Sequence, residues 1–338
     1  MSTKLVFYDL THEDKLAIKK FFADQSGIEL VLIEQSLNEE NISNANSADI
    51  ISVFVSSVIN KKSLAAMPKL KMIAARSTGF DNIDTVEAKK RGIKICNVPS
   101  YGENTVAEYA FLLLLSITRK LHSTLQAMHA SQIEHTKLTG FDLKNRTLGV
   151  IGTGRIGAHV IRIARGFEME VIAYDPYPNQ QLAEQLSFKY LSLDELMKKS
   201  DIITLHAPYT KQNHHMINAK NLKLAKKGAF LINTARGDLV DTKALVEKLV
   251  SGHLGGVGLD VIEGEDLLDV DEEISLLKSS GKKRLNLALE LSILEKLPNV
   301  IITPHNAFNS IEALDRIRLT TLENINGFLT GSIQNQVS

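Results

Sequence analysis

The segment from Thr147 to Gly157 constrains the fold of this chain more than any other stretch. It reads T-L-G-V-I-G-T-G-R-I-G, an apolar run that ends at glycine and is followed by the helical apolar spacing that starts at Ile156. The glycine at 152 permits a tight turn, Gly154 lets the backbone approach a pyrophosphate, and Gly157 lets the helix pack against the strand. The segment therefore predicts the strand, turn and helix of a dinucleotide-binding unit, with the phosphates at the positive end of the helix dipole.

A second feature downstream supports this interpretation. The next apolar run, V-I-A-Y, ends at Asp175, which stands 18 positions after Gly157. That is close to the offset of roughly 20 residues at which an acidic side chain binds the ribose hydroxyls. A carboxylate there favours NAD, because it repels a 2′-phosphate and the following Pro176 and Tyr177 supply no cation. The alternatives are glycines that serve packing alone and an aspartate that is merely solvated.

Size and composition limit the class of protein. A chain of 338 residues suggests two domains, each with its own core. The 39 basic residues equal the 39 acidic residues, so no net field recruits nucleic acid or an anionic membrane. The single cysteine, Cys96, excludes an internal disulfide and predicts a buried thiol. With no signal-peptide pattern and no apolar run long enough to span a bilayer, we expect a cytoplasmic protein without membrane or nucleic-acid partners.

The first 100 residues alternate strand-like and helix-like segments without a glycine fingerprint. This pattern predicts a smaller parallel-sheet domain that does not bind the dinucleotide. The sequence R-S-T-G-F-D-N-I-D follows one of its strands. Ligands of open α/β sheets bind at such strand ends, so the amides of Thr78 and Gly79 are candidate substrate contacts. The alternative is that Gly79 only serves a turn.

A second series of strands and helices begins at residue 147 and predicts a doubly wound parallel sheet. We assign residues 101–305 to the dinucleotide domain, and residues 1–100 with 306–338 to the substrate domain. The helical pattern from Ile311 to Phe328 is expected to return to the first domain. The stretch from Glu263 to Pro298 departs from the alternation, and its apolar periodicity predicts an ordered insertion rather than a linker.

Polar residues follow the strands of this second series, and parallel strands bring them to one edge of the sheet. Arg236 has the planar, permanent charge that binds a carboxylate in bidentate fashion. His305 is a candidate proton donor to a carbonyl oxygen. Glu265 is available to orient that histidine and to stabilise its charged form. The alternatives are a surface ion pair for Arg236, a core histidine and a solvated acidic face. The other histidines, among them His214 and His215, show no partner cluster in the sequence, and no metal site is predicted.

Taken together, several motifs in order resemble the D-isomer-specific 2-hydroxyacid dehydrogenases. They are G-T-G-R-I-G with Asp175, L-H-A-P-Y-T, N-T-A-R-G-D-L-V-D, G-L-D-V-I-E-G-E and T-P-H-N-A-F. Within that family, F-D-N-I-D, V-P-S-Y and P-H-N-A-F look most like the D-lactate dehydrogenase branch. The resemblance implies a Rossmann-type NAD domain inserted into a flavodoxin-like substrate domain, and a homodimer built through the nucleotide domains.

The resemblance also assigns residues. It implies Arg236 as substrate anchor, Glu265 as the acid paired with the histidine, His305 as proton donor and Tyr101 near the substrate. The residues that it places around NAD, beside the three glycines, are Arg155, Ile156, Asp175, Ala207, Pro208, Asn213, Thr234, Ala235 and Asp260.

Reduction of pyruvate to D-lactate by NADH is the expected activity. Hydroxypyruvate, glyoxylate, a branched 2-keto acid or phosphite stay open as substrates, because Y-G-E-N-T-V-A-E also resembles phosphonate dehydrogenase. A nucleotide-sensing module similar to the corepressors of this fold is the alternative outside enzymes. The interval between Glu265 and His305 is longer than in compact members, and the residues after His305 are less aromatic than is common in lactate enzymes; both departures leave the substrate open.

Overall fold

The computed structural model describes residues 2–265 and 282–337, which form two compact units. Unit 1 comprises residues 1–101 and 310–338, and unit 2 comprises residues 102–309. Each unit is built around one parallel sheet with helices on both faces, as expected for strands that are joined by helical crossovers. The predicted fold class, two doubly wound α/β domains, is confirmed.

Unit 1 contains five parallel strands in the order β2-β1-β3-β4-β5, the flavodoxin-like order. The strands are β1 (Thr3–Phe7), β2 (Ile28–Leu32), β3 (Ile50–Val53), β4 (Met72–Ala75) and β5 (Lys94–Cys96). The helices are α1 (His12–Phe21), the 3₁₀ turn η1 (Ile42–Ala45), α2 (Lys61–Ala65), α3 (Thr85–Lys90) and α13 (Ile311–Thr330). Two apolar clusters cover the two faces of the sheet.

The C-terminal helix α13 packs on unit 1 although it is more than 200 residues away from β5 in the sequence. Its buried Leu322 and Ile325 join Ile18 and Phe22, in and just after α1, in one apolar cluster. Arg318 of α13 donates from Nε to a carboxylate oxygen of Asp14 at 2.6 Å. Desolvation acts against the charged forms of these two partners, but their hydrogen bonds and charges outweigh it, so the pKa of Asp14 is lowered and that of Arg318 is raised.

Unit 2 contains seven parallel strands in the order β12-β11-β10-β9-β6-β7-β8. This is the doubly wound order, in which β7 and β8 extend the sheet on one side of β6 and the strands from β9 onward extend it on the other side. The strands are β6 (Thr147–Ile151), β7 (Glu170–Tyr174), β8 (Lys189–Tyr190), β9 (Ile202–Leu205), β10 (Ala229–Asn233), β11 (Leu254–Leu259) and β12 (Val300–Ile302).

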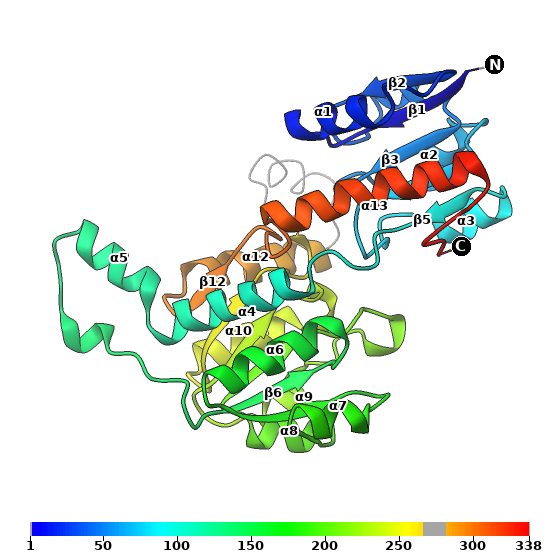
Figure 1. Cartoon of the computed structure of the whole chain (residues 1–338). Coiled ribbons are helices and arrows are strands. Elements are labelled where there is room, and N and C mark those ends of the chain that lie inside the picture. The colour runs from blue at the N-terminus through cyan, green and yellow to red at the C-terminus, as the bar shows by residue number, and fades with distance from the viewer. Residues whose placement is uncertain (1, 266–281, 338) are drawn as a thin grey trace. The chain divides into compact units, whose positions relative to one another are not determined.

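Helices cover both faces of the unit 2 sheet. One face carries α4 (Glu103–Thr118) and α6 (Arg155–Gly166), which lie side by side (Figure 1), and α7 (Gln180–Gln185). The other face carries α8 (Leu193–Lys199), α9 (Ala219–Leu222), α10 (Thr242–Val250) and α12 (Lys282–Lys296). The 3₁₀ turns are η2 (His135–Leu138), η3 (Lys211–Asn213) and η4 (Gly237–Leu239). Helix α5 (Leu121–His129) has no buried residue and projects away from the sheet.

The expected insertion between Glu263 and Pro298 is seen in part. Its second half forms α12, whose Leu291 and Leu294 are buried against the core of unit 2. Residues 266–281 lie outside the described part of the chain.

Candidate functional site

The glycine turn between β6 and α6 has the geometry that its sequence predicts. Gly152 has a φ of +90°, which only glycine adopts without strain, and a Cβ there would lie 2.7 Å from the Ala207 nitrogen. A Cβ at Gly157 would lie 2.1 Å from the Gly152 carbonyl oxygen, so α6 touches the turn directly. A Cβ at Gly154, by contrast, would meet no described atom within 4 Å. Two of the three glycines therefore serve close packing, and the third leaves space above the start of α6.

Asp175 directly follows β7 and holds this turn in place. Its Oδ2 accepts hydrogen bonds from the backbone nitrogen of Thr153 at 2.8 Å and from Thr153 Oγ1 at 3.0 Å. Its Oδ1 accepts from the Tyr177 nitrogen at 2.9 Å. The Thr153 hydroxyl also lies 2.8 Å from the hydroxyl of Tyr190. The carboxylate is thus fixed beside the glycine turn, where a ribose would lie next to the bound pyrophosphate.

The same edge of the sheet has further groups that suit a dinucleotide. Helix α6 begins at Arg155 and Ile156 with no side-chain cap, so its first amides point toward the space above Gly154. Thr234 Oγ1 is buried and has no hydrogen-bond partner among the described residues, so a ligand hydroxyl or phosphate would satisfy it. These groups, with Asp175, fit NAD, whose pyrophosphate and ribose need amide donors and a carboxylate.

The loop after β9 closes beside the glycine turn. The Asn213 side chain donates to the Pro208 carbonyl at 2.8 Å and accepts from the Thr210 nitrogen at 2.7 Å, which holds the loop after Ala207 in one conformation. His206, at the start of this loop, contacts Thr204 Oγ1 through Nε2 at 2.8 Å, while its buried Nδ1 has no described partner. Burial lowers the pKa of His206 to about 3, so this imidazole is neutral at physiological pH.

Glu265 and His305, which are 40 positions apart, meet in unit 2. His305 Nδ1 lies 3.1 Å from Glu265 Oε2, and the two side chains are 36% and 41% exposed. In the tautomer with the proton on Nδ1, the ring donates to this carboxylate and leaves Nε2 for a ligand. A half-exposed imidazole backed by a carboxylate can hold and release a proton.

The conformation of His305 depends on Asp260 at the end of β11. His305 has a φ of +49°, and its backbone nitrogen donates to the Asp260 carbonyl at 2.9 Å. The buried Asp260 carboxylate accepts hydrogen bonds from Thr303 Oγ1 and from the nitrogens of Asn306 and Ala307, at 2.6, 2.8 and 2.8 Å. In this structure the carboxylate that the sequence resemblance places near NAD supports the loop of the histidine.

Arg236 follows β10 at the same edge of the sheet. Its guanidinium donates from Nη1 to the Ala235 carbonyl at 2.7 Å, and the backbone carbonyl of Arg236 accepts from Asn233 Nδ2 at 2.9 Å. The next residue, Gly237, touches the segment that carries Glu265, because a Cβ at Gly237 would lie 2.1 Å from the Ile262 carbonyl carbon. The turn of Arg236 and the segment of Glu265 are therefore in direct backbone contact.

The candidate substrate contacts of unit 1 form a separate group. Thr78 donates from Oγ1 to the Val98 carbonyl at 2.8 Å, and Ser77 donates to the Gly79 carbonyl at 2.5 Å. The Tyr101 carbonyl accepts from Arg316 Nε at 2.6 Å. These bonds hold the loop after β4 and the end of unit 1 in defined conformations, and the role of these residues toward a substrate stays a prediction.

Arg76, just before this loop, was not singled out from the sequence. Its guanidinium is buried and donates to the carbonyls of Tyr8 and Asp9, both at 2.7 Å. Burial lowers the pKa of Arg76, and the charges of Asp14 and Asp9 act in the opposite direction. The arginine in R-S-T-G was the available signal, but a buried role cannot be inferred from it without the three-dimensional contact.

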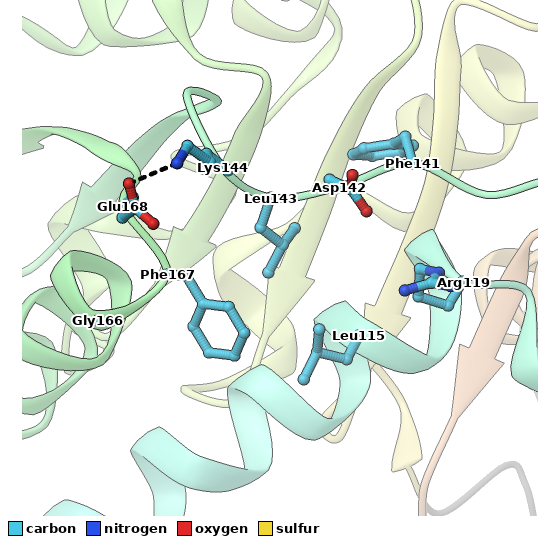
Figure 2. Close-up of a pocket in the computed structure, with 9 residues that line it drawn as sticks. All are labelled: Leu115, Arg119, Phe141, Asp142, Leu143, Lys144, Gly166, Phe167 and Glu168. Carbon is cyan, nitrogen blue, oxygen red and sulfur yellow. Dashed lines mark ion pairs between the residues drawn. The ribbon is translucent and has the colours of Figure 1, made fainter.

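A cavity in unit 2 is lined by none of the site residues described above (Figure 2). It is lined by Leu115, Arg119 and Phe167, among others, and the ion pair of Lys144 with Glu168 at 2.8 Å borders it. These two charged residues precede β6 and β7, so the cavity belongs to the edge of the sheet opposite the glycine turn. Within residues 2–265 and 282–337, no helix is long and apolar enough to cross a membrane and no cluster of metal ligands is found.

Comparisons with known proteins agree with this geometry. Residues 111–307 match the model of the D-isomer specific 2-hydroxyacid dehydrogenase NAD-binding domain. A D-lactate dehydrogenase of Escherichia coli is 34% identical, covering 97% of each chain, and an aromatic 2-oxoacid reductase of Clostridium sporogenes is 38% identical, covering 96% of each. The crystal structure of a D-lactate dehydrogenase from Aquifex aeolicus, complexed with NAD and lactic acid, superimposes with a TM-score of 0.87 at 36% identity over 98% of each chain.

Proposed function

The chain belongs to the D-isomer-specific 2-hydroxyacid dehydrogenases, which are NAD-dependent oxidoreductases, and from this premise we propose that it reduces pyruvate to D-lactate with NADH. The observation that carries the proposal is the contact of His305 Nδ1 with Glu265 Oε2 at 3.1 Å. It supplies the oriented imidazole that protonation of a keto oxygen requires.

When bound at the glycine turn, NADH would supply the hydride for the keto carbon, and the residues of this chain would bind the substrate and deliver the proton. The Arg236 guanidinium binds the substrate carboxylate through two parallel hydrogen bonds and orients the carbonyl group. The His305 imidazolium donates a proton from Nε2 to the carbonyl oxygen as the electron pair of the carbonyl bond moves onto that oxygen. The product is a hydroxyl group, and His305 is left neutral. Glu265 stabilises the imidazolium before transfer and holds the ring in one orientation.

The residues proposed for the cofactor act by position and charge. The amides at the start of α6, beside Arg155 and Ile156, face the pyrophosphate, and Asp175 binds the ribose hydroxyls. Thr234, Ala235, Ala207, Pro208 and Asn213 complete the walls of this site. From unit 1, Thr78, Gly79 and Tyr101 are proposed to contact the substrate.

A second candidate is reduction of an aromatic 2-keto acid, favoured by the aromatic 2-oxoacid reductase that is 38% identical to this chain. The experiment that separates the candidates follows the loss of NADH absorbance with pyruvate, phenylpyruvate, hydroxypyruvate, glyoxylate and 2-ketoisocaproate in turn. Phosphite with NAD and pyruvate with NADPH are the controls. The proposal requires the highest kcat/KM with pyruvate and NADH. A higher kcat/KM with another keto acid would identify that acid as the substrate. NADH binding without any turnover favours the corepressor-like alternative.

We also propose that the enzyme is a cytoplasmic homodimer. Helix α5 and the residues after it expose Leu125 and Met128, which are 47% and 66% accessible, and Ile133. Such an apolar surface on a projecting helix suits a second copy of the chain. Sedimentation should give the mass of a dimer for the wild type and of a monomer for Leu125→Glu. The buried free thiol of Cys96, whose pKa burial raises to about 11, suits a reducing compartment.

A further inference from the structure

Near Glu265, a second histidine and glutamate meet in unit 2. His215 Nε2 lies 3.1 Å from Glu263 Oε1, and the two side chains are 27% and 14% exposed. The two atoms lie within ion-pair distance, although Nε2 has no hydrogen-bond partner of good geometry among the described residues. The other oxygen of Glu263 accepts from Thr242 Oγ1 at 3.1 Å. The Glu263 carboxylate is thus held from two directions, by the loop after η3 and by the start of α10.

The backbone fixes His215 in place. The residue has a φ of +52°, and its nitrogen donates to the Asp238 carbonyl at 2.9 Å. Its own carbonyl accepts from Asn218 Nδ2 at 2.9 Å. The ring stacks on His214 with centroids 3.8 Å apart. These contacts leave the imidazole little freedom to follow a displaced Glu263.

The segment after Glu263 transmits its position to Glu265. The Ile262 nitrogen donates to Glu265 Oε1 at 3.2 Å, so residues 262–265 form one closed turn whose remaining carboxylate oxygen faces His305. The turn cannot move toward the Arg236 side, because Gly237 already touches Ile262 and Glu263. The contacts of Glu263 with His215 and Thr242 oppose a displacement away from Gly237.

Several charged groups surround the pair of His215 and Glu263. Desolvation, followed by the charge of Asp241, raises the pKa of Glu290 on α12, and Glu263 and Glu247 add to the effect. Four carboxylates from α10, α12 and the Glu263 segment therefore lie close together. The Nε2 group of His215 and the ammonium group of Lys243 face them. Removal of His215 leaves Glu263 among like charges, which repel it.

We propose that His215 and Glu263 are positioning residues that hold Glu265 against His305 and so set the rate of proton transfer. The inference rests on the proposed function, since it assigns the pair to the same acid–base step. It adds two residues that touch neither the substrate nor the cofactor and that act through Glu265.

The test compares His215→Leu, which removes the side-chain donor, with His215→Gln, whose amide nitrogen lies near the position of Nε2. Pyruvate is the substrate, and His12→Leu on the exposed start of α1 is the matched control. We expect His215→Leu to lower kcat roughly tenfold or more, because a displacement of about 1 Å at a reacting group costs up to a hundredfold. KM for pyruvate and the affinity for NADH should stay unchanged, His215→Gln should recover most of kcat, and His12→Leu should match the wild type.

A shift in the pH dependence of kcat distinguishes a displaced Glu265 from a general loss of folded protein. Reduction needs protonated His305, so kcat falls as the pH rises, and a displaced Glu265 makes this fall begin at lower pH. We expect Glu265→Gln and His215→Leu to shift the fall in the same direction. The double variant should behave like Glu265→Gln alone, since His215 acts only through Glu265. If His215→Leu does not fold, Glu263→Gln, which keeps the shape of the side chain, takes its place in every comparison.

The two failures are distinct. A Glu265→Gln variant with wild-type kcat and pH profile overturns the proposed acid–base function. An altered Glu265→Gln together with an unaltered His215→Leu, or additive effects in the double variant, overturns the positioning role alone. If no keto acid is turned over, the pH at which the imidazole resonances of His305 shift in NMR spectra replaces kcat: a lower pH in His215→Leu than in the wild type supports positioning, and an equal pH contradicts it.

Discussion

Gly237→Ala tests how tightly the turn of Arg236 is packed against the segment of Glu265. A Cβ at position 237 would lie 2.1 Å from the Ile262 carbonyl carbon, 2.2 Å from its oxygen and 2.4 Å from the Glu263 nitrogen. Ordinary contacts of this kind begin at 3.4 Å, so the two backbones must separate by about 1.3 Å. Both contacts are between backbone segments and not with the end of a flexible side chain. The displacement therefore falls on the residues proposed to bind and protonate the substrate.

The expected loss follows from that distance. A misplacement of about 1 Å costs up to a hundredfold in rate, or about 2.7 kcal/mol in transition-state free energy. Overpacking should also lower the free energy of unfolding by about 1–3 kcal/mol. We therefore expect kcat/KM for pyruvate to fall by about two orders of magnitude at a temperature where the variant is fully folded. The assay is steady-state NADH oxidation, with circular dichroism as the measure of folding.

Gly166→Ala is the matched control, because a Cβ there meets no described atom within 4 Å and the residue ends α6 with no positive φ. It should keep wild-type activity and unfold at an equal or slightly higher temperature. Wild-type kcat/KM in Gly237→Ala would refute the reasoning, since it would mean that the two segments adjust without cost. A loss of kcat/KM that only matches the unfolded fraction of the variant would refute the catalytic part of this prediction.

Three further predictions concern the rest of unit 2. Gly157→Ala should weaken NADH binding, followed by fluorescence titration, by about tenfold (1.4 kcal/mol) or more, because its Cβ would lie 2.1 Å from the Gly152 oxygen; affinity equal to the wild type would contradict this. Because burial lowers the pKa of His206 from 6.5 to about 3, the unfolded chain takes up a proton that the folded chain refuses as the pH falls through this interval. This residue alone should make unit 2 about 2–3 kcal/mol less stable at pH 4.5 than at pH 7, as measured by hydrogen exchange in β9. His206→Gln should remove this contribution to the pH dependence of stability. Asp260→Ala should destabilise the loop of His305 by about 3 kcal/mol in chemical unfolding, because three hydrogen-bond donors lose their acceptor. Asp260→Asn should retain part of this stability. Equal stability of the wild type and both variants would contradict the prediction.

The fold class could be predicted from the sequence because local patterns determine it. Glycines at 152, 154 and 157 need a turn and a close helix, and parallel strands then place polar residues at one edge of the sheet. The flavodoxin-like and Rossmann-type strand orders agree with that expectation. The meeting of Glu265 with His305 was also inferred, because each follows a strand of the same sheet.

Other features depend on contacts that no local pattern records. His215 and Glu263 are 48 positions apart, and each looks like an ordinary surface residue in the sequence. The support that Asp260 gives to the loop of His305 depends on the register of β11 with β12, which the apolar pattern of the two strands does not specify. The buried guanidinium of Arg76 likewise depends on the carbonyls of Tyr8 and Asp9, which directly follow β1.

The most direct measurement is kcat for pyruvate with saturating NADH in the wild type and in His305→Gln, together with the affinity of both proteins for NADH. We expect turnover to D-lactate in the wild type, a loss of about 10²–10⁴-fold in kcat in the variant, and equal NADH affinity, because in the proposed mechanism the histidine transfers the proton and does not bind the dinucleotide. Wild-type kcat in His305→Gln would contradict the proposed mechanism. Absence of turnover in both proteins would contradict the proposed substrate.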